Sequence, residues 1–287
     1  MQLIDAGMIA FAAWHALKKR VDYPLTFQVP RMLRKLVHEA EDTYALFWND
    51  KRLWKTERWP AYRDRPEIWD EAGREDFDTM VDVLTGLGAV QFRAEGREAD
   101  ELLAAAAHLF EGTEPVVIRS DDKDFMQLLT PSTAMIGRVR KTVRAEDVEE
   151  KLGVTLECVA DFLALTGDQA DGIPRIVTPA PAKKLLAEHG HVMDWIDGEV
   201  SASDGVVQQL QENREQLRLN YELVDLSREA VGELPEPLLE HWGDVDRVRA
   251  IGERLDITYL KDENLGHEFA ELKEWGDRTR RRLEELR

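Results

Sequence analysis

The residues from which the fold is most directly read are VVIRSDDKDF (116–125). The β-branched run at 116–118 is typical of a buried strand, because such side chains fit a pleated surface. Three aspartates follow it, at positions 121, 122 and 124. Ligands of an open parallel sheet bind beyond the carboxyl ends of its strands. The stretch therefore predicts a strand that delivers carboxylates to a site.

On both sides of this strand, short apolar runs alternate with longer helical patterns. Such alternation predicts an α/β fold with a parallel sheet and crossover helices. We expect further strands at Gln2–Ile4, Tyr44–Trp48 and about Val90–Phe92. We expect helices at about Met8–Lys19, Pro30–Glu41, 76–87 and Leu102–Phe110. Beyond about Val154 helices should dominate.

Acidic residues follow the other expected strands as well. Asp5 follows the first strand and Asp50 the second. Glu98, Asp100 and Glu101 lie at the start of the helix that follows the short strand near 90–92. Asp168 and Asp171 follow the helix around 159–165. Any one of them could cap a helix. Capping does not explain convergence, because like charges at one sheet edge repel unless cations neutralise them.

The donor types indicate which cation would bind. Hard carboxylate oxygens select magnesium or manganese over zinc. Cys158 is the only cysteine, and His189 and His191 are the only closely spaced histidines, which we read as a feature of a helix C-terminus. Several carboxylates that hold two divalent ions are typical of in-line phosphodiester hydrolysis. The sequence has no phosphate-binding loop, dinucleotide fingerprint or nucleophile elbow.

The net charge of −19 argues at first against a nucleic-acid partner. Residues 16–65, however, carry twelve bases against seven acids, a local charge of +5. Within the polar stretch 51–75, aromatic residues lie among the bases: Trp54, Trp59, Tyr62 and Trp69. Bases interleaved with aromatic rings are typical of a single-stranded nucleic-acid channel. An amphipathic surface helix whose tryptophans pack on the core explains them equally well.

Length and composition bound the remaining possibilities. A chain of 287 residues with 43% hydrophobic residues is long enough for one large or two modest globular domains. It has no apolar run long enough to cross a bilayer. Its first basic residues, Lys18 and Lys19, follow the apolar run at the start, whereas in a secretory signal they would precede it. We therefore expect a cytoplasmic protein in which Cys158 is a small buried residue.

Five segments together resemble the flap endonuclease and 5′-to-3′ exonuclease family, which includes the 5′-nuclease domain of bacterial family A DNA polymerases. They are LIDAG (3–7), FWND (47–50), GREADELL (96–103), RSDDKDFMQLLT (119–130) and GVTLECVADFLALTGDQADGIP (153–174). The similarity runs from about residue 3 to about 230. No polymerase sequence follows, so we expect a free-standing member in a bacterial or phage-infected cell.

The resemblance implies an α/β, PIN-like parallel-sheet nuclease core with a helical arch and a helix-three-turn-helix region. We expect the core at 1–155 with the arch at about 51–75, a helical DNA-binding region at 156–230 and a C-terminal helical extension at 231–287. A free 5′ end would thread beneath the arch.

The resemblance also assigns roles to residues. It implies two Mg²⁺ ions, with Mn²⁺ able to substitute. The implied metal ligands are Asp5, Asp50, Glu98, Asp100, Glu101, Asp122, Asp124, Asp168 and Asp171. Glu101 departs from the family, where aspartate is usual. Arg63 and Arg65 are implied as catalytic contacts of the scissile phosphate, and Lys55, Arg58 and Tyr62 as DNA-binding residues.

The segment after Pro174 departs further from the family. A glycine-rich hairpin that binds the duplex backbone, often with K⁺, is usual there, but this chain has Arg175, Thr178 and Ala180 where the glycines would be. Larger residues keep backbone amides away from a phosphate. We expect Lys183 and Lys184 to supply charge for duplex binding, and the potassium site stays open.

The expected function is therefore a magnesium-dependent 5′ nuclease acting on DNA with a free 5′ end or a 5′ flap. We expect no membrane partner and no small-molecule cofactor. The balance between exonuclease and flap endonuclease activity, and the oligomeric state, stay open. Two alternatives remain: a PIN-like ribonuclease, and a catalytically weakened protein that binds flap DNA.

Overall fold

A six-stranded sheet forms the centre of the computed structural model, which describes residues 1–50, 53–64, 69–139, 141–193 and 205–287. The strand order is β3-β2-β1-β4-β5-β6, and only β6 runs antiparallel to its neighbour. The strands are β1 (Gln2–Asp5), β2 (Tyr44–Phe47), β3 (Gln91–Phe92), β4 (Val116–Arg119), β5 (Thr133–Ile136) and β6 (Thr142–Val143). The four predicted strands are confirmed. Strands β5 and β6 were not predicted, because they are short and lie toward the sheet edge.

Both faces of the sheet are buried, as parallel sheets require. Successive strand residues point to opposite faces, so Leu3 and Phe47 join one hydrophobic cluster whereas Ile4 and Leu46 join the other. The cluster that contains Ile4 packs against α1 (Ala6–Leu17), α2 (Pro24–Ala40) and α4 (Glu71–Gly86). The cluster that contains Leu3 packs against α5 (Ala99–Phe110) and continues into the helices that follow residue 155.

Helix α2 begins six residues before the predicted start at Pro30. Pro24 occupies the first turn, where a missing amide is harmless, and the backbone amides of Leu25 and Thr26 donate to the buried Asp76 carboxylate at 2.7 and 3.0 Å. Pro30 lies inside the helix and cannot donate to the Thr26 carbonyl. The Tyr259 hydroxyl donates to that carbonyl instead, at 2.9 Å. A tertiary contact therefore lets the helix pass through a proline.

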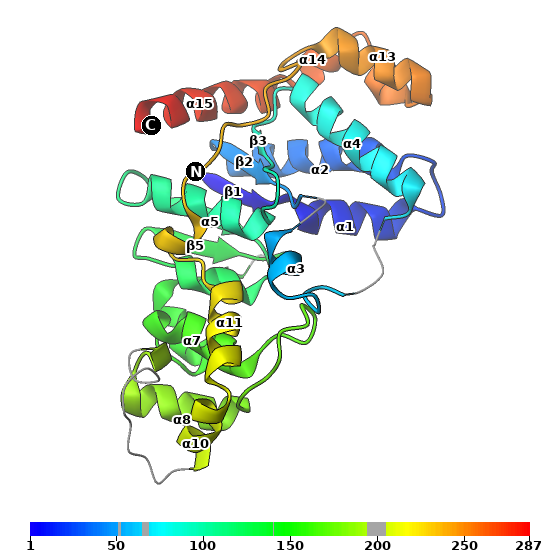
Figure 1. The fold of residues 1–287 in the computed structure, drawn as a ribbon. Coiled ribbons are helices and arrows are strands. Elements are labelled where there is room, and N and C mark those ends of the chain that lie inside the picture. The colour runs from blue at the N-terminus through cyan, green and yellow to red at the C-terminus, as the bar shows by residue number, and fades with distance from the viewer. Residues whose placement is uncertain (51–52, 65–68, 140, 194–204) are drawn as a thin grey trace.

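Helices dominate the described residues after Val154, as predicted (Figure 1). They are α7 (Val159–Thr166), α8 (Pro179–His189), α10 (Gly205–Glu212), α11 (Arg214–Val224) and α12 (Arg228–Val231), after the short α6 (Val148–Leu152). The buried Asn220 side chain donates to the carbonyls of Ala164 and Pro174 at 2.8 and 2.7 Å. These bonds tie α11 to the end of α7 and to the loop that follows it.

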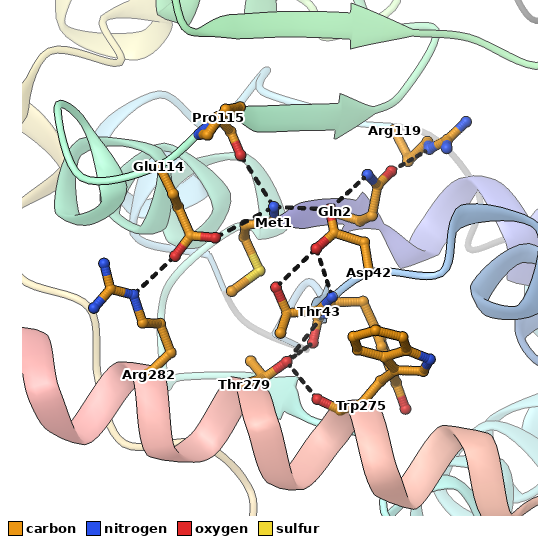
Figure 2. Close-up of polar contacts among 11 residues, drawn as sticks. Met1, Gln2, Asp42, Thr43, Glu114, Pro115, Arg119, Trp275, Thr279 and Arg282 are labelled. Carbon is orange, nitrogen blue, oxygen red and sulfur yellow. Dashed lines mark hydrogen bonds and ion pairs between the residues drawn. The ribbon is translucent and has the colours of Figure 1, made fainter.

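The last helices return to the N-terminal half of the chain. They are α13 (Val245–Leu255), α14 (Leu265–Glu268) and α15 (Ala270–Leu286). Figure 2 shows α15 beside the start of β2, where the Tyr44 amide donates to the Thr279 hydroxyl at 3.0 Å. Arg282 binds Glu114 at 2.9 Å, and Glu114 also pairs with the Met1 nitrogen at 3.5 Å. None of the helices in the described ranges is long and apolar enough to cross a membrane.

We expect the substitution Thr279→Val to lower the free energy of unfolding by about 1–3 kcal/mol, because the buried Tyr44 amide loses its acceptor. Thr79→Val is the matched control, since the Thr79 hydroxyl donates to the Glu75 carbonyl of its own helix near the surface. That variant should change the free energy of unfolding by less than about 0.5 kcal/mol. Urea unfolding of the three proteins measures both effects, and equal losses would contradict the role of Thr279.

Candidate active site

The carboxyl ends of β1, β2 and β4 open into a cavity of about 850 Å³. Residues of the α5 N-terminus and of the loop after α7 complete its wall. Five of the nine acids predicted as ligands line this cavity: Asp5, Asp50, Asp100, Asp122 and Asp168. The fold therefore brings together carboxylates as far apart in the chain as Asp5 and Asp168, which are separated by 163 residues.

Ser120 connects two of these acids. Its hydroxyl donates to Asp5 Oδ2 at 2.8 Å and accepts from the Asp122 amide at 3.1 Å. Burial raises the pKa of Asp5, and the charge of Asp122 adds to this rise. Burial also raises the pKa of Asp122. The two carboxylates share a site in which the charged form of each is disfavoured.

Asp124 lies just inside the short 3₁₀ helix η1 (Lys123–Leu128), which Asp122 caps by accepting from the Asp124 amide at 3.0 Å. Asp124 Oδ1 is buried and has no hydrogen-bond partner among the described residues. Burial, followed by the charge of Asp122, raises the pKa of Asp124 to about 7. A buried oxygen without a donor costs free energy unless a proton or a cation reaches it.

The three acids at the start of α5 have different surroundings. The Glu98 amide donates to Glu101 Oε2 at 2.8 Å and the Trp54 indole donates to Glu101 Oε1 at 2.7 Å. Glu101 thereby completes a capping box at this helix end. Of the three, only Asp100 lines the cavity. Its pKa is raised well above the usual range by burial and then by the charges of Glu98 and Asp5.

Glu98 is fully buried among groups from residues 55–63. Its carboxylate binds Lys55 Nζ at 2.8 Å and Arg63 Nη1 at 2.7 Å, and it accepts from the Tyr62 hydroxyl at 2.9 Å. Burial by itself would raise the pKa of Glu98, but the Lys55 and Arg63 charges outweigh it and lower the pKa. Glu98 therefore connects the predicted arch segment to the sheet edge that borders the cavity.

Arg63 bridges three carboxylates. Besides Glu98, its guanidinium binds Asp171 Oδ1 at 2.8 Å and approaches Asp100 Oδ2 at 3.9 Å. Its backbone has a positive φ of 49°, and its amide donates to the Asp171 carbonyl at 3.0 Å. Gly172 permits this approach, since a Cβ there would lie 2.0 Å from the Ala61 oxygen. Arg63 lines the cavity with 21% of its side chain exposed.

The other predicted residues of 51–75 serve different contacts. Arg58, at the end of α3 (Trp54–Arg58), forms an exposed pair with Glu222 at 3.0 Å. The Trp59 indole donates to the Gly172 carbonyl at 3.0 Å, and Trp69 packs edge-on against Trp14 at 5.1 Å. These two tryptophans therefore pack against the rest of the protein, as in the alternative interpretation of the 51–75 stretch as a surface helix with tryptophans on the core. Arg65 lies outside the described residues.

A family profile matches the part of the chain that carries most of these residues. The profile described as 5'-3' exonuclease, N-terminal resolvase-like domain matches residues 1–153, more than half of the 287 residues. The chain belongs to this family.

Relatives in the 5'-3' exonuclease family include much longer proteins. DNA polymerase I of Mycobacterium tuberculosis (strain ATCC 25618 / H37Rv) is 30% identical over 284 residues, which cover 91% of this chain and 31% of that protein. The thermostable DNA polymerase I of Thermus filiformis is 28% identical over 279 residues, covering 91% and 32%. The chain thus spans about a third of the length of the curated relatives that it matches.

Solved structures share the fold. The T5 D15 protein co-crystallised with metal ions has a TM-score of 0.69 at 19% identity, covering 96% of this chain and 98% of that one. The catalytic core of Rad2 in complex with DNA substrate has a TM-score of 0.52 at 15% identity, covering 88% and 87%. Together with the parallel sheet, these likenesses confirm the predicted α/β, PIN-like nuclease fold.

The segment that departs from the 5'-3' exonuclease family pattern covers the end of the loop between α7 and α8 and the start of α8. Gly167 and Gly172 have φ values of 63° and 70°, and Asp168 pairs with Ile173 across the turn. Thr178 precedes α8, in which Pro179 is the first residue, and Arg175, Thr178 and Ala180 are exposed. Lys184 is exposed and approaches Glu188 at 3.8 Å, whereas Lys183 lies 5.7 Å from the Phe162 ring.

Several residues at the site were missing from the sequence predictions, among them Ser120, Lys123, Arg93 and Phe11. Ser120 directly follows β4 and could have been recognised from that position. Lys123 binds Asp168 at 3.0 Å, and Arg93 approaches Asp50 at 3.5 Å. Phe11 lines the cavity with 42% of its surface exposed. The last three carry no local signal, because their partners lie on other elements.

The donor set suits hard divalent cations. The acids of the cavity offer only carboxylate oxygens, and Asp124 Oδ1, which no donor in the described ranges reaches, adds a buried one. Asp50 is less available, because it accepts from the Gly96 amide at 2.9 Å besides approaching Arg93. Asp168 likewise accepts from Lys123 and from the Ala170 amide. Asp5, Asp100, Asp122 and Asp124 are therefore the acids with the strongest need for a cation.

We expect Asp124→Asn to stabilise the protein at pH 8 in the presence of a chelator. The folded-state pKa of about 7 exceeds the ordinary value of 3.8, so between these values the folded chain binds more protons than the unfolded chain. Its free energy of unfolding therefore falls as the pH rises through this window. The gain over wild type should vanish below about pH 4, as measured by urea unfolding across pH.

Asp121→Asn is the control for this pH dependence. Burial would raise the pKa of Asp121, but hydrogen bonds from Arg138 lower it. A lowered pKa stabilises the folded chain above the unfolded pKa, so this variant should lose stability at pH 8. A loss of stability at pH 8 in Asp124→Asn as well would contradict a raised pKa at Asp124.

Proposed function

We propose that this chain is a divalent-metal-dependent 5′ nuclease that hydrolyses DNA at free 5′ ends or 5′ flaps. The observation that carries the proposal is the set of buried carboxylates at one sheet edge, including Asp124 Oδ1, which has no donor among the described residues. Membership of the 5'-3' exonuclease family supports the same reaction. The activity needs no nucleophilic side chain.

We assign metal binding first to Asp5, Asp100, Asp122 and Asp124, whose raised pKa values a divalent cation would offset. Asp50 and Asp168 complete the wall of the cavity and can take part once Arg93 and Lys123 move aside. Two Mg²⁺ ions, or Mn²⁺ in their place, would supply an activated water and charge stabilisation for an in-line displacement. A protein of the same fold supports the metal, since the T5 D15 protein was co-crystallised with metal ions.

Glu98, Glu101 and Asp171 have a positioning role in this proposal. Glu101 holds the α5 N-terminus and the Trp54 indole in place. Glu98 and Asp171 hold the Arg63 guanidinium at the cavity wall. Arg63 is thereby preorganised to offset charge on the phosphoryl group, without reorganisation during the reaction.

The remaining walls of the cavity suit a single-stranded nucleic acid. Arg74, Arg93 and Arg138 contribute positive charge to the lining, and Phe11 contributes exposed aromatic surface. Cations that bind phosphates and rings that stack on bases are the means by which proteins hold single-stranded nucleic acid. The catalytic core of Rad2 forms a complex with a DNA substrate, which supports DNA here. We propose that the loop between α7 and α8, with Lys183 and Lys184, contacts the duplex backbone.

One observation favours a second candidate, a flap-DNA-binding protein with weakened catalysis. The carboxylates of Glu98 and Glu101 are both committed to contacts within the protein. A related PIN-like ribonuclease would use the same acids on RNA. Cleavage assays on matched substrates separate the three functions.

The first test uses end-labelled 5′-flap, nicked and blunt DNA, together with a matched RNA flap. We expect magnesium-dependent cleavage of DNA at the 5′ end or flap and none in a chelator. Asp122→Asn combined with Asp124→Asn should lower the rate at least about 100-fold, because charge stabilisation at the reacting phosphate is lost. Asp246→Asn is the control and should retain the rate, since the exposed Asp246 pairs with Arg249 on α13 and does not line the cavity.

Full magnesium-dependent cleavage by the double variant would overturn the metal assignment. Preferred cleavage of the RNA flap would identify the ribonuclease. Tight flap binding without cleavage in either magnesium or manganese would identify the binding protein.

The second test concerns Arg63. Arg63→Lys keeps the charge beside Glu98 but loses the planar fork that reaches Asp171. We expect kcat to fall by about 10- to 100-fold while the fold is retained, as for partners that orient a metal site. The matched control is Arg58→Lys, whose exposed pair with Glu222 should not affect kcat. Equal kcat values in both variants would remove Arg63 from the mechanism.

A further inference from the structure

A second cluster of ligand side chains lies at the opposite end of α7 from Asp168. Cys158 ends the 3₁₀ turn η3 (Leu156–Cys158), and Asp161 lies in the first turn of α7. His191 follows the end of α8. Its ring nitrogen, the Cys158 sulfur and an Asp161 oxygen all lie within 4.8 Å of one another. Two segments 30 residues apart in the chain thus bring three chemically different donors together.

The burial of the three residues suits a small ion. Asp161 is 0% exposed and Cys158 is 6% exposed, whereas 47% of the His191 side chain is exposed. Asp161 Oδ2 lies 3.0 Å from His191 Nδ1, and Asp161 Oδ1 accepts from the Val192 amide at 2.9 Å. The backbone bond orients the carboxylate, while the exposed imidazole leaves a path from solvent.

We propose that Cys158, Asp161 and His191 bind one zinc ion, with water as the fourth ligand. Thiolate, imidazole and carboxylate are the donors that Zn²⁺ takes in tetrahedral sites. Zn–N and Zn–O bonds of about 2.0–2.1 Å place two tetrahedral ligands about 3.3 Å apart, close to the spacing of Asp161 Oδ2 and His191 Nδ1. The Cys158 sulfur lies within 4.8 Å of both and would move toward them when the ion binds.

Binding requires a change of protonation at two ligands. Burial raises the pKa of the Cys158 thiol, so the metal-free residue carries a proton that is released to solvent when the sulfur binds zinc. In the metal-free protein the His191 Nδ1–H donates to Asp161; on binding, this proton is exchanged through solvent for one on Nε2, and Nδ1 binds the ion. Asp161 binds as the carboxylate. The complex then has one thiolate, one carboxylate and one neutral imidazole around the ion.

The site has a different chemistry from the catalytic edge of the sheet. That edge offers carboxylate oxygens, which favour magnesium or manganese, whereas this cluster has sulfur and nitrogen. An α7 of 8 residues separates the two by about 12 Å along the helix. Zinc here would fasten the start of α7 to the chain after α8. Its effect is therefore on the stability of the helix pair, independent of the proposed nuclease activity.

Cobalt(II) is the probe for the site, because thiolate ligation produces a charge-transfer absorption that carboxylate sites lack. We expect the full chain with excess Mg²⁺ to bind one equivalent of Co²⁺ with this absorption and with visible bands of tetrahedral cobalt. Zn²⁺ should displace the cobalt and abolish both signals. Cys158→Ser should lack the charge-transfer absorption, and His191→Ala should weaken apparent Co²⁺ affinity at least about 10-fold.

His189→Ala is the matched control, since it removes an exposed imidazole two residues away and should leave cobalt affinity unchanged. Thermal unfolding supplies an independent readout: zinc should raise the Tm of wild type and of His189→Ala more than that of Cys158→Ser. Circular dichroism checks that each variant is folded. Absence of the thiolate signal in wild type, or equal cobalt affinity in His191→Ala, would overturn the site and leave Asp161 as a cap for the Val192 amide.

Discussion

Mutual repulsion among buried carboxylates is the constraint around which the cavity edge of the sheet is arranged. Burial disfavours the charged forms of Asp5, Asp100 and Asp122, and each charge makes the next one more costly. Asp124 adds to this unfavourable energy, because its buried Oδ1 accepts no hydrogen bond from any residue in the described ranges. A sheet whose central strands end in these residues is unfavourable until positive charge reaches the edge. Positive charge comes from the protein and, in the function proposed above, from divalent ions.

The protein's own cations come from segments far away in the chain. Arg63 and Lys55 neutralise Glu98, and Lys123 neutralises Asp168. Lys55 and Arg63 are therefore part of the electrostatic balance of the sheet edge, although they lie on a segment between β2 and α4. Arg63 also lines the cavity, so its position affects both the shape of the cavity and the charge near its carboxylates.

The rest of the fold holds this edge in place from behind. Both faces of the sheet are buried, and α15 binds the beginning of β2 through Thr279 and the turn before β4 through Arg282 (Figure 2). At the other end, Asn220 fastens the loop that carries Asp168 and Asp171. The strands and loops that deliver the acids therefore have little freedom to separate, although separation would relieve their repulsion.

Strand periodicity and strand ends were determined by the sequence alone. The buried runs at β1, β2 and β4 and the acids directly after them predicted the parallel sheet and the edge at which Asp5 and Asp122 lie, because both follow from local residue order. The contacts of Glu98 and Glu101 were decided by the tertiary structure. Their partners Lys55, Arg63 and Trp54 lie more than 30 residues away, and no local pattern shows that these side chains turn inward. The same reason explains the passage of α2 through Pro30, which depends on Tyr259, and the meeting of Cys158 with His191. A sequence shows which residues can satisfy a charge or a carbonyl, but only the packed fold decides which of them reaches it.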